Sequence, residues 1–345
     1  MAVPEQTSRR RFLTGALMGA AAVGATGAAV AAWRVFRARS GVAAAAVGAV
    51  PASDSHVALT HRPAGAVATN LRRLRALALA PDGRLYVAGD QTICVYAPGA
   101  DGVPGPLSSQ IDPQGVATCL AAADDGRLFV GVDGQIAGFA ADGGRVATWA
   151  IPEGEAILTS LAVLPDGILA ADAAGRRVWR FDNSGTCTGA IGGPARDGSS
   201  DGFIVPSPFF DVAVDGDGTV WVGNPGRHRV ERYSADGAFQ GAWGTFGAEA
   251  AEFCGCCNPS YVTLYPPGNG GPAGLLTSEK GIPRVKLYDL QGNLRGVVAG
   301  PEQLAGESQG LDVAVAPRDP RTPGTGRVFV LAPRARKVLI FEATG

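Results

Sequence analysis

The sequence predicts an all-β protein, a six-bladed β-propeller preceded by an N-terminal signal or anchor helix. Three observations predict this fold. After residue 70, a short apolar strand, an Asp-Gly or equivalent turn, a second strand and a third strand ending in an aromatic residue recur six times. The terminal aromatic residues are 42 to 55 residues apart, a period that suits a four-stranded blade. Glycine supplies 50 of the 345 residues, twice its usual share, and the 24 prolines are spread along the chain, which indicates many tight turns.

The repeat is clearest in its fourth copy, where residues 212–214 and 220–222 flank the Asp217-Gly218 turn. Short apolar strands joined by such a turn are typical of β-hairpins. The strands expected in the other copies are residues 77–79, 85–87 and 95–96; 128–130; 168–169; 262–264 and 275–276; and 313–315 and 328–330. The terminal aromatic residues are Tyr96, Phe139, Phe181, Tyr233, Tyr288 and Phe341.

A fourth strand follows each aromatic residue, as in residues 145–149, except in the last copy, which ends at Gly345. Because a radial array of blades must close, we expect the missing outer strand to come from the segment around His56 to His61, with residues 57–60 as the strand. The predicted domains are a signal or anchor in residues 1–40, a flexible linker in residues 41–56 and the propeller in residues 57–345.

Residues 211–214 and 218–222, followed by Asn224, residues 227–230 and Tyr233, resemble the repeat of the NHL family of propellers. The likeness extends over residues 57–345 and is strongest in the fourth copy. It implies a six-bladed fold and no single activity, because this family includes scaffolds, lyases and relatives with lactonase activity.

The N-terminus matches the twin-arginine export pattern at residues 8–13, with Arg9 and Arg10 as the arginine pair. A weakly apolar, Ala- and Gly-rich run follows in residues 13–33, long enough to cross a bilayer as a helix. Residues 29–31 and 44–46 both fit a small-x-small cleavage site, so removal and retention as a membrane anchor both stay open. We therefore expect a periplasmic or secreted protein that engages the twin-arginine export machinery.

The charge pattern argues against nucleic acid as a partner. Six arginines and one glutamate lie in residues 1–40, so the remaining chain carries six more acidic than basic residues. An acidic exported part does not favour anionic polymers or acidic lipid head groups. With only three histidines, His56, His61 and His228, a His-rich zinc or haem site or a Ser-His-Asp triad is not expected.

Long loops precede the innermost strands of blades four, five and six, in residues 192–208, 244–259 and 300–310. Cys254, Cys256 and Cys257 lie within four residues in the second of these loops. Three thiolates so close could ligate a soft metal ion such as copper(I) or zinc, or part of an iron–sulfur centre. They could equally form a disulfide or remain buried thiols. Cys94, Cys119 and Cys187 lie in predicted strands and are expected to be buried and inert.

Aligning the innermost strands on their turns places six residues at one ring position near the axis: Ala76, Cys119, Ser160, Asp211, Tyr261 and Asp312. Asp211 and Asp312, on either side of Tyr261, could coordinate calcium, as acidic groups do near the channel of lactonase-type propellers. Alternatively, the two carboxylates hydrogen-bond to backbone amides at the start of a strand.

The loop between the second and third strands of blade five contains Glu279, Lys280 and Arg284 and should project beside the cysteine loop. These residues could bind a carboxylate, a metal-linked group or a partner's loop, or they could form a solvated turn.

The sequence contains no recognisable set of catalytic residues, so a binding function is favoured over a catalytic one. The leading hypothesis is an exported propeller that binds an envelope protein or a small ligand on its long-loop face, with a metal at the cysteine loop as an option. One alternative is an extracytoplasmic metal or redox protein that uses Cys254, Cys256 and Cys257. The other is a lactonase or lyase that depends on a divalent cation held by Asp211 and Asp312.

Overall fold

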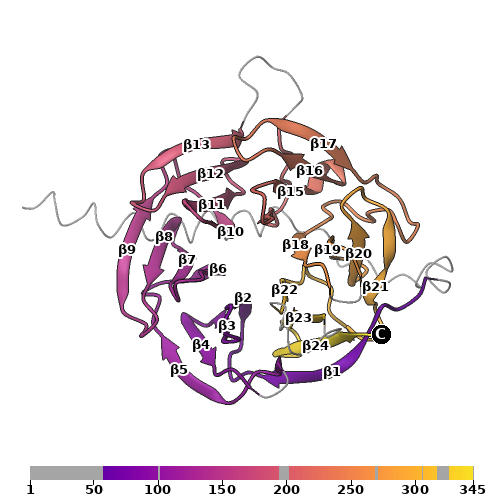
Figure 1. Cartoon of the computed structure of the whole chain (residues 1–345), viewed down its shortest axis with the longest axis horizontal. Coiled ribbons are helices and arrows are strands. Elements are labelled where there is room, and N and C mark those ends of the chain that lie inside the picture. Colours follow the sequence, from indigo (N-terminus) through magenta and orange to yellow (C-terminus); the bar gives the residue numbers. More distant parts are fainter. Residues whose placement is uncertain are drawn as a thin grey trace, which may run out of the picture. The chain divides into compact units, whose positions relative to one another are not determined.

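Six four-stranded antiparallel sheets are arranged as blades around a common axis (Figure 1). The computed structural model describes residues 57–99, 102–193, 202–268, 271–304, 306–316 and 326–344. The innermost strands contact one another in sequence order, and the last contacts the first, so the ring closes. The predicted all-β, six-bladed propeller is therefore confirmed, whereas the predicted export signal with Arg9 and Arg10, the anchor helix and the linker lie outside the described residues.

Each of the first five blades is a meander of four consecutive strands, counted from the axis outward. Blades one to three contain β2 (Leu74–Leu79), β3 (Leu85–Gly89), β4 (Thr92–Tyr96) and β5 (Leu107–Ile111); β6 (Ala117–Ala122), β7 (Leu128–Val132), β8 (Gln135–Phe139) and β9 (Arg145–Ala150); and β10 (Leu158–Leu164), β11 (Gly167–Asp172), β12 (Arg177–Asp182) and β13 (Cys187–Gly192). Blades four and five contain β14 (Val212–Val214), β15 (Val220–Asn224), β16 (Arg229–Tyr233) and β17 (Phe239–Trp243); and β18 (Tyr261–Tyr265), β19 (Gly274–Glu279), β20 (Arg284–Asp289) and β21 (Leu294–Ala299).

Blade six is made from both ends of the described chain. Its strands, from the axis outward, are β22 (Val313–Val315), β23 (Arg327–Ala332), β24 (Lys337–Ala343) and β1 (His61–Ala68). Figure 1 shows the indigo strand β1 beside the yellow strand β24 at the outer edge. The N-terminal segment therefore supplies the missing outer strand, as expected, but the predicted position was wrong: the strand begins at His61 and does not occupy residues 57–60.

Residues 58–60 pair with the neighbouring blade instead. Thr60 N donates to Val297 O over 2.9 Å, and Val297 N donates to Ala58 O over 3.2 Å, next to a parallel bridge between Leu59 and Val297. The segment thus binds the outer strand of blade five before it closes blade six. We call residues 58–68 the latch.

The Asp-Gly turns form the expected hairpins. Asp82 Oδ1 accepts a hydrogen bond from Arg84 N over 3.0 Å, and Gly83 has a φ of +87°. Asp217 and Gly218 repeat this arrangement in blade four, where Gly218 has a φ of +86°. Glycine adopts this left-handed conformation without the steric cost that a Cβ imposes, and the aspartate satisfies an amide that the tight turn leaves unpaired.

The core consists of apolar layers between neighbouring blades. Each of six buried clusters contains side chains from two adjacent blades, including blades six and one. The terminal aromatic residues predicted from the repeat are all buried: Tyr96, Phe139, Phe181, Tyr233, Tyr288 and Phe341. The repeat therefore encodes the packing between blades as well as their number. Within the described residues, no helix is both long and apolar enough to span a membrane.

Candidate functional site

The cysteine loop, residues 244–260, leads from the outer strand of blade four to the innermost strand of blade five. Its anchor is Phe253, which is fully buried and stacks with Trp243 at a centroid distance of 6.2 Å. Three cysteines follow within four residues. Cys254 is partly exposed, Cys256 is exposed and Cys257 is buried. The predicted placement of this loop beside the hairpin of Glu279 and Arg284 is reflected in direct contacts.

A buried group of charges fastens the loop to blade five. Glu279 and Arg284 lie directly opposite each other on β19 and β20, and Arg284 Nε lies 2.6 Å from Glu279 Oε2. Lys286 Nζ lies 3.2 Å from Glu279 Oε1. All three side chains are almost completely buried. Buried charges are stable only when they are paired and hydrogen-bonded, so the three groups depend on one another.

The same charges hold the backbone of the cysteine loop. Cys254 N donates to Glu279 Oε1 over 3.3 Å, and Lys286 Nζ donates to Ala250 O over 3.1 Å and to Glu252 O over 2.8 Å. Glu279 and Arg284, predicted as ligand-binding residues, are thus buried in a network that positions the loop.

Asn258 and Lys280 complete the attachment. The Asn258 side chain donates to the carbonyl oxygens of Cys254 and Lys280, and its Oδ1 accepts from Lys280 N over 2.9 Å. The Lys280 side chain turns toward the loop of blade four, where Nζ donates to Ser207 Oγ over 2.8 Å and lies 4.8 Å from the Phe209 ring centroid. Lys280 therefore links the loops that enter blades four and five and remains partly exposed.

Two large apolar side chains are exposed on the loops that enter blades four and five. The side chains of Ile204 and Phe246 are 43% and 66% exposed. Ile204 O accepts a hydrogen bond from Gly226 N over 2.9 Å, and a Cβ at Gly226 would lie 2.3 Å from Ile204 Cγ2. The His228 ring lies 5.0 Å from that of Phe246, and His228 Nε2 lies 2.6 Å from Gly255 O. We call Ile204, His228, Phe246 and Cys256 the apical patch.

The six predicted ring positions lie in or directly before the innermost strands, and Asp211 and Asp312 connect neighbouring blades. Asp211 Oδ2 accepts a hydrogen bond from Val262 N in the next blade over 2.6 Å. Asp312 Oδ2 accepts one from Leu77 N, across the closure from blade six to blade one, over 2.8 Å. Each carboxylate also accepts the N–H of its own following residue. The geometry thus agrees with the backbone hydrogen bonds expected as the alternative to calcium binding.

The surroundings of the ring aspartates favour their neutral forms. Burial raises the pKa of Asp211 to about 6 and, reinforced by the nearby charge of Asp211, raises the pKa of Asp312 to about 8. Burial also raises the pKa of Tyr261 well above its ordinary value and that of Cys119 to about 12. At pH 7 Asp312 therefore mostly keeps its proton, whereas Asp211 is mainly ionised.

Asp312 should make the folded state less stable as the pH rises from about 4 to about 8. In the unfolded chain this carboxyl is ionised above about pH 4, whereas the folded protein retains the proton up to a pKa of about 8. Stability present at low pH is therefore lost as the pH rises, by about 2 kcal/mol between pH 6.5 and 8. Urea unfolding should show this decrease in the wild type and a flatter profile in Asp312→Asn. Parallel profiles would mean that Asp312 is already ionised at neutral pH.

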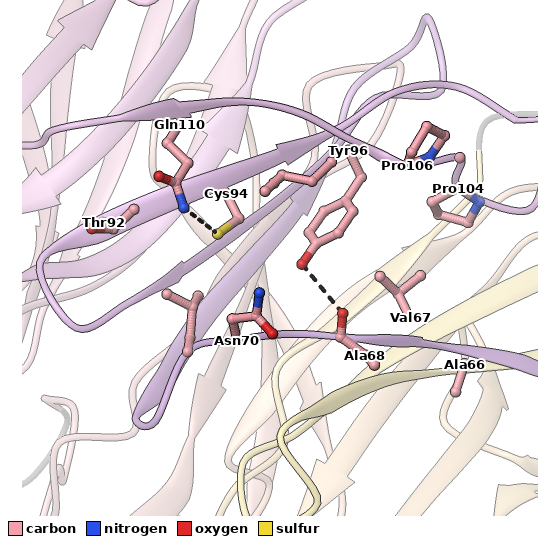
Figure 2. Close-up of a pocket in the computed structure, with 13 residues that line it drawn as sticks. Ala66, Val67, Ala68, Asn70, Thr92, Cys94, Tyr96, Pro104, Pro106 and Gln110 are labelled. Carbon is pink, nitrogen blue, oxygen red and sulfur yellow. Dashed lines mark hydrogen bonds between the residues drawn. The ribbon is translucent and has the colours of Figure 1, made fainter.

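A cavity of about 450 Å³ lies away from the predicted site, between the latch strand β1 and the outer strands of blade one. Figure 2 shows Cys94, Tyr96 and Gln110 lining it together with Pro104 and Pro106. Gln110 Nε2 lies 3.7 Å from Cys94 Sγ, and Tyr96 Oη donates weakly to Ala68 O over 3.5 Å. The lining has no charged side chain, and burial raises the pKa of the Cys94 thiol.

Sequence reasoning missed this cavity and several residues of the loop face. The turn in residues 97–106 of blade one, with its three prolines, is longer than the Asp-Gly turns elsewhere and could have indicated an exceptional feature. Lys286 also had a signal, because it is one of three lysines and stands between Val285 and Leu287 in an apolar strand. Cys187 was expected to be buried and is partly exposed, whereas Cys94 and Cys119 are buried.

The described residues contain no group of three or more His, Cys, Asp or Glu side chains that could hold a metal ion. The three-cysteine metal centre and the calcium site therefore remain predictions without a matching ligand set in this conformation. No protein-family model matches the chain, and no curated protein matches it. Fold and site together define a six-bladed β-propeller whose loops on one face are held rigidly and expose an apolar patch.

Proposed function

We propose that this protein is an exported, non-catalytic scaffold that binds a protein partner through the apical patch on blades four and five. The observation that carries the proposal is the exposure of Phe246 and Ile204 on loops fixed by buried charges and hydrogen bonds. Large exposed aromatic side chains on rigid supports are the usual anchors of protein interfaces, because little conformational entropy is lost when they are covered.

The proposed cellular location and class of partner rest on the sequence. The twin-arginine pattern around Arg9 and Arg10 supports export, whereas the likeness of residues 211–233 to the NHL repeat supports the propeller fold and favours no single activity. The excess of acidic residues after residue 40 favours a protein partner over a nucleic acid. We infer an extracytoplasmic location and a partner that is itself an envelope protein.

Phe246 provides the sharpest test of the proposed interface. A photo-crosslinking amino acid at position 246 should capture one stoichiometric partner in the native host. With that partner purified, Phe246→Ala should weaken binding by at least about tenfold, as expected for loss of an aromatic anchor. Isothermal titration calorimetry measures the change.

Phe239 is the matched control, since it is also a phenylalanine, is 57% exposed and belongs to the same blade. It lies at the start of β17, and β17 ends where the chain enters the cysteine loop. Crosslinks from position 239 should not capture the same partner, and Phe239→Ala should leave binding unchanged. Equal crosslinking from both positions, or no stoichiometric adduct from position 246, would contradict the proposal.

A further inference from the structure

The cysteine loop brings two adjacent thiols into contact. Cys256 Sγ lies 3.2 Å from Cys257 Sγ, and Cys256 is exposed while Cys257 is buried. A disulfide requires a sulfur separation of about 2.0 Å, so the pair needs to close by about 1 Å. We propose that Cys256 and Cys257 form a reversible vicinal disulfide, a redox site on the long-loop face that takes other disulfides as its reaction partners.

The surrounding bonds hold both flanks of the pair while leaving Cys256 accessible. On one side, Cys254 is bonded through its backbone to Glu279 and Asn258. On the other side, Asn258 is bonded to Lys280 of the blade-five hairpin. Closure of the disulfide therefore requires movement within residues 255–257 only, and the blade can remain unchanged.

A bond between adjacent cysteines suits a redox role better than a structural one. Neighbouring Cα atoms are about 3.8 Å apart, below the range of roughly 4.4–6.8 Å in ordinary disulfides. The bond is consequently strained, and strained or exposed disulfides are the ones most readily reduced. It also closes no chain loop of appreciable length, so it constrains the unfolded state very little.

The exchange balances in atoms and electrons. The Cys256 thiolate attacks one sulfur of an external disulfide, forms a mixed disulfide and releases the first thiolate. Cys257 then loses its proton and attacks Cys256 Sγ, which breaks the mixed disulfide and releases the second thiolate. The two cysteines lose two electrons and two protons in all, and the external disulfide is reduced to two thiols. The thiol contact with Cys257, together with burial, raises the pKa of Cys256, so the first step should accelerate as the solution becomes more alkaline.

Oxidised glutathione is the probe that tests this site in the full-length protein. The reduced protein is equilibrated with mixtures of reduced and oxidised glutathione, quenched with acid, alkylated and digested with trypsin. Residues 233–280 form one tryptic peptide that contains all three loop cysteines. With increasing oxidised glutathione, we expect this peptide to lose two hydrogen atoms and to retain one alkylatable thiol. Reduced glutathione should reverse the change.

Serine variants assign the bond. Cys254→Ser should still lose two hydrogen atoms, whereas Cys256→Ser should not. Because Cys256 is exposed, its replacement should leave the fold intact, and Cys257→Ala provides a second variant of the pair. Retention of all three thiols at every glutathione ratio would overturn the proposal. So would loss of the disulfide in Cys254→Ser, because the bond would then involve Cys254. The test needs no protein partner, so it can fail or succeed independently of the proposed scaffold function.

Discussion

Replacing Glu279 by alanine is expected to lower the free energy of unfolding by about 3–5 kcal/mol, because it leaves two buried cations without their carboxylate. Arg284 and Lys286 both lie within 3.2 Å of Glu279 and are almost completely buried. Lys286 bonds to Ala250 O and Glu252 O of the cysteine loop, so its ammonium group cannot reach water without moving that loop. Urea unfolding followed by circular dichroism measures the loss.

The substitution should also loosen the cysteine loop before the blade unfolds. Glu279 Oε1 accepts the amide hydrogen of Cys254, and Lys286 holds the carbonyl oxygens of Ala250 and Glu252. Once the carboxylate is removed, Lys286 loses its contact with Glu279, and the loop should open more often to solvate the ammonium group. Alkylation of the buried Cys257 should therefore become faster in Glu279→Ala under native conditions.

Glu153 offers a matched control. Its carboxylate lies 2.7 Å from Arg177 Nη1, a distance close to that of the Glu279–Arg284 pair, but the Glu153 side chain is 61% exposed. An exposed ion pair contributes at most about 1 kcal/mol, so Glu153→Ala should have a small effect. If Glu279→Ala were as mild as the control, the buried charges would be compensated by other contacts, and the loop would not depend on Glu279.

The repeat made most of the fold predictable, because the packing between blades uses the same residue types in every copy. The terminal aromatic residues and the Asp-Gly turns each satisfy a local requirement, burial in one case and a left-handed backbone in the other. Such requirements are visible in a single sequence. The alignment of ring positions uses the same regularity, and Asp211 and Asp312 directly precede the innermost strands β14 and β22.

The structural role of the charged residues in blade five could not be predicted from the sequence in this way. Glu279 and Arg284 flank a turn, and a turn in isolation exposes its charges. In the folded protein, residues 244–260 of the preceding connection instead bring the backbone of Cys254 onto Glu279 and that of Glu252 onto the neighbouring Lys286. This connection has no repeat and little apolar pattern, so its path depends on tertiary contacts that sequence periodicity does not report.

The latch was misplaced for a related reason. Only His61 and Val67 are buried in β1, and its remaining residues are small or polar, with an irregular register between Pro63 and Gly65. This strand lacks the alternation that marks a half-buried strand, whereas residues 57–60 form a short apolar run that ends in threonine. The pairing of β1 with β24 is fixed instead by the free edge that the last blade leaves open.

Protonation of His61 is expected to weaken the latch as the pH falls. The buried His61 ring lies between Thr60 Oγ1, 2.9 Å from Nδ1, and Tyr265 Oη, 3.1 Å from Nε2. Burial, together with the positive charge of Arg295, lowers the pKa of His61 to about 4. In the unfolded chain the ring takes up a proton near pH 6.5, so stability present above pH 6.5 is lost as the pH falls toward 4, by about 3 kcal/mol.

The ring aspartates act in the opposite direction over the same range, so the wild-type profile alone does not isolate His61. The raised pKa values of Asp211 and Asp312 mean that both groups stabilise the fold as the pH falls. His61→Gln keeps a hydrogen-bonding side chain and removes the titration. As the pH falls from 6.5 to 4, the unfolding free energy of the wild type should therefore decrease by about 3 kcal/mol relative to that of this variant. Tyr265→Phe, which removes the hydroxyl but not the imidazole, should shift stability while preserving the pH dependence.

If His61→Gln instead followed the wild type at every pH, the imidazole would be protonated equally in the folded and unfolded states. Hydrogen exchange of the β24 amides would then show no acid-dependent opening, because nothing would pull β1 from that edge.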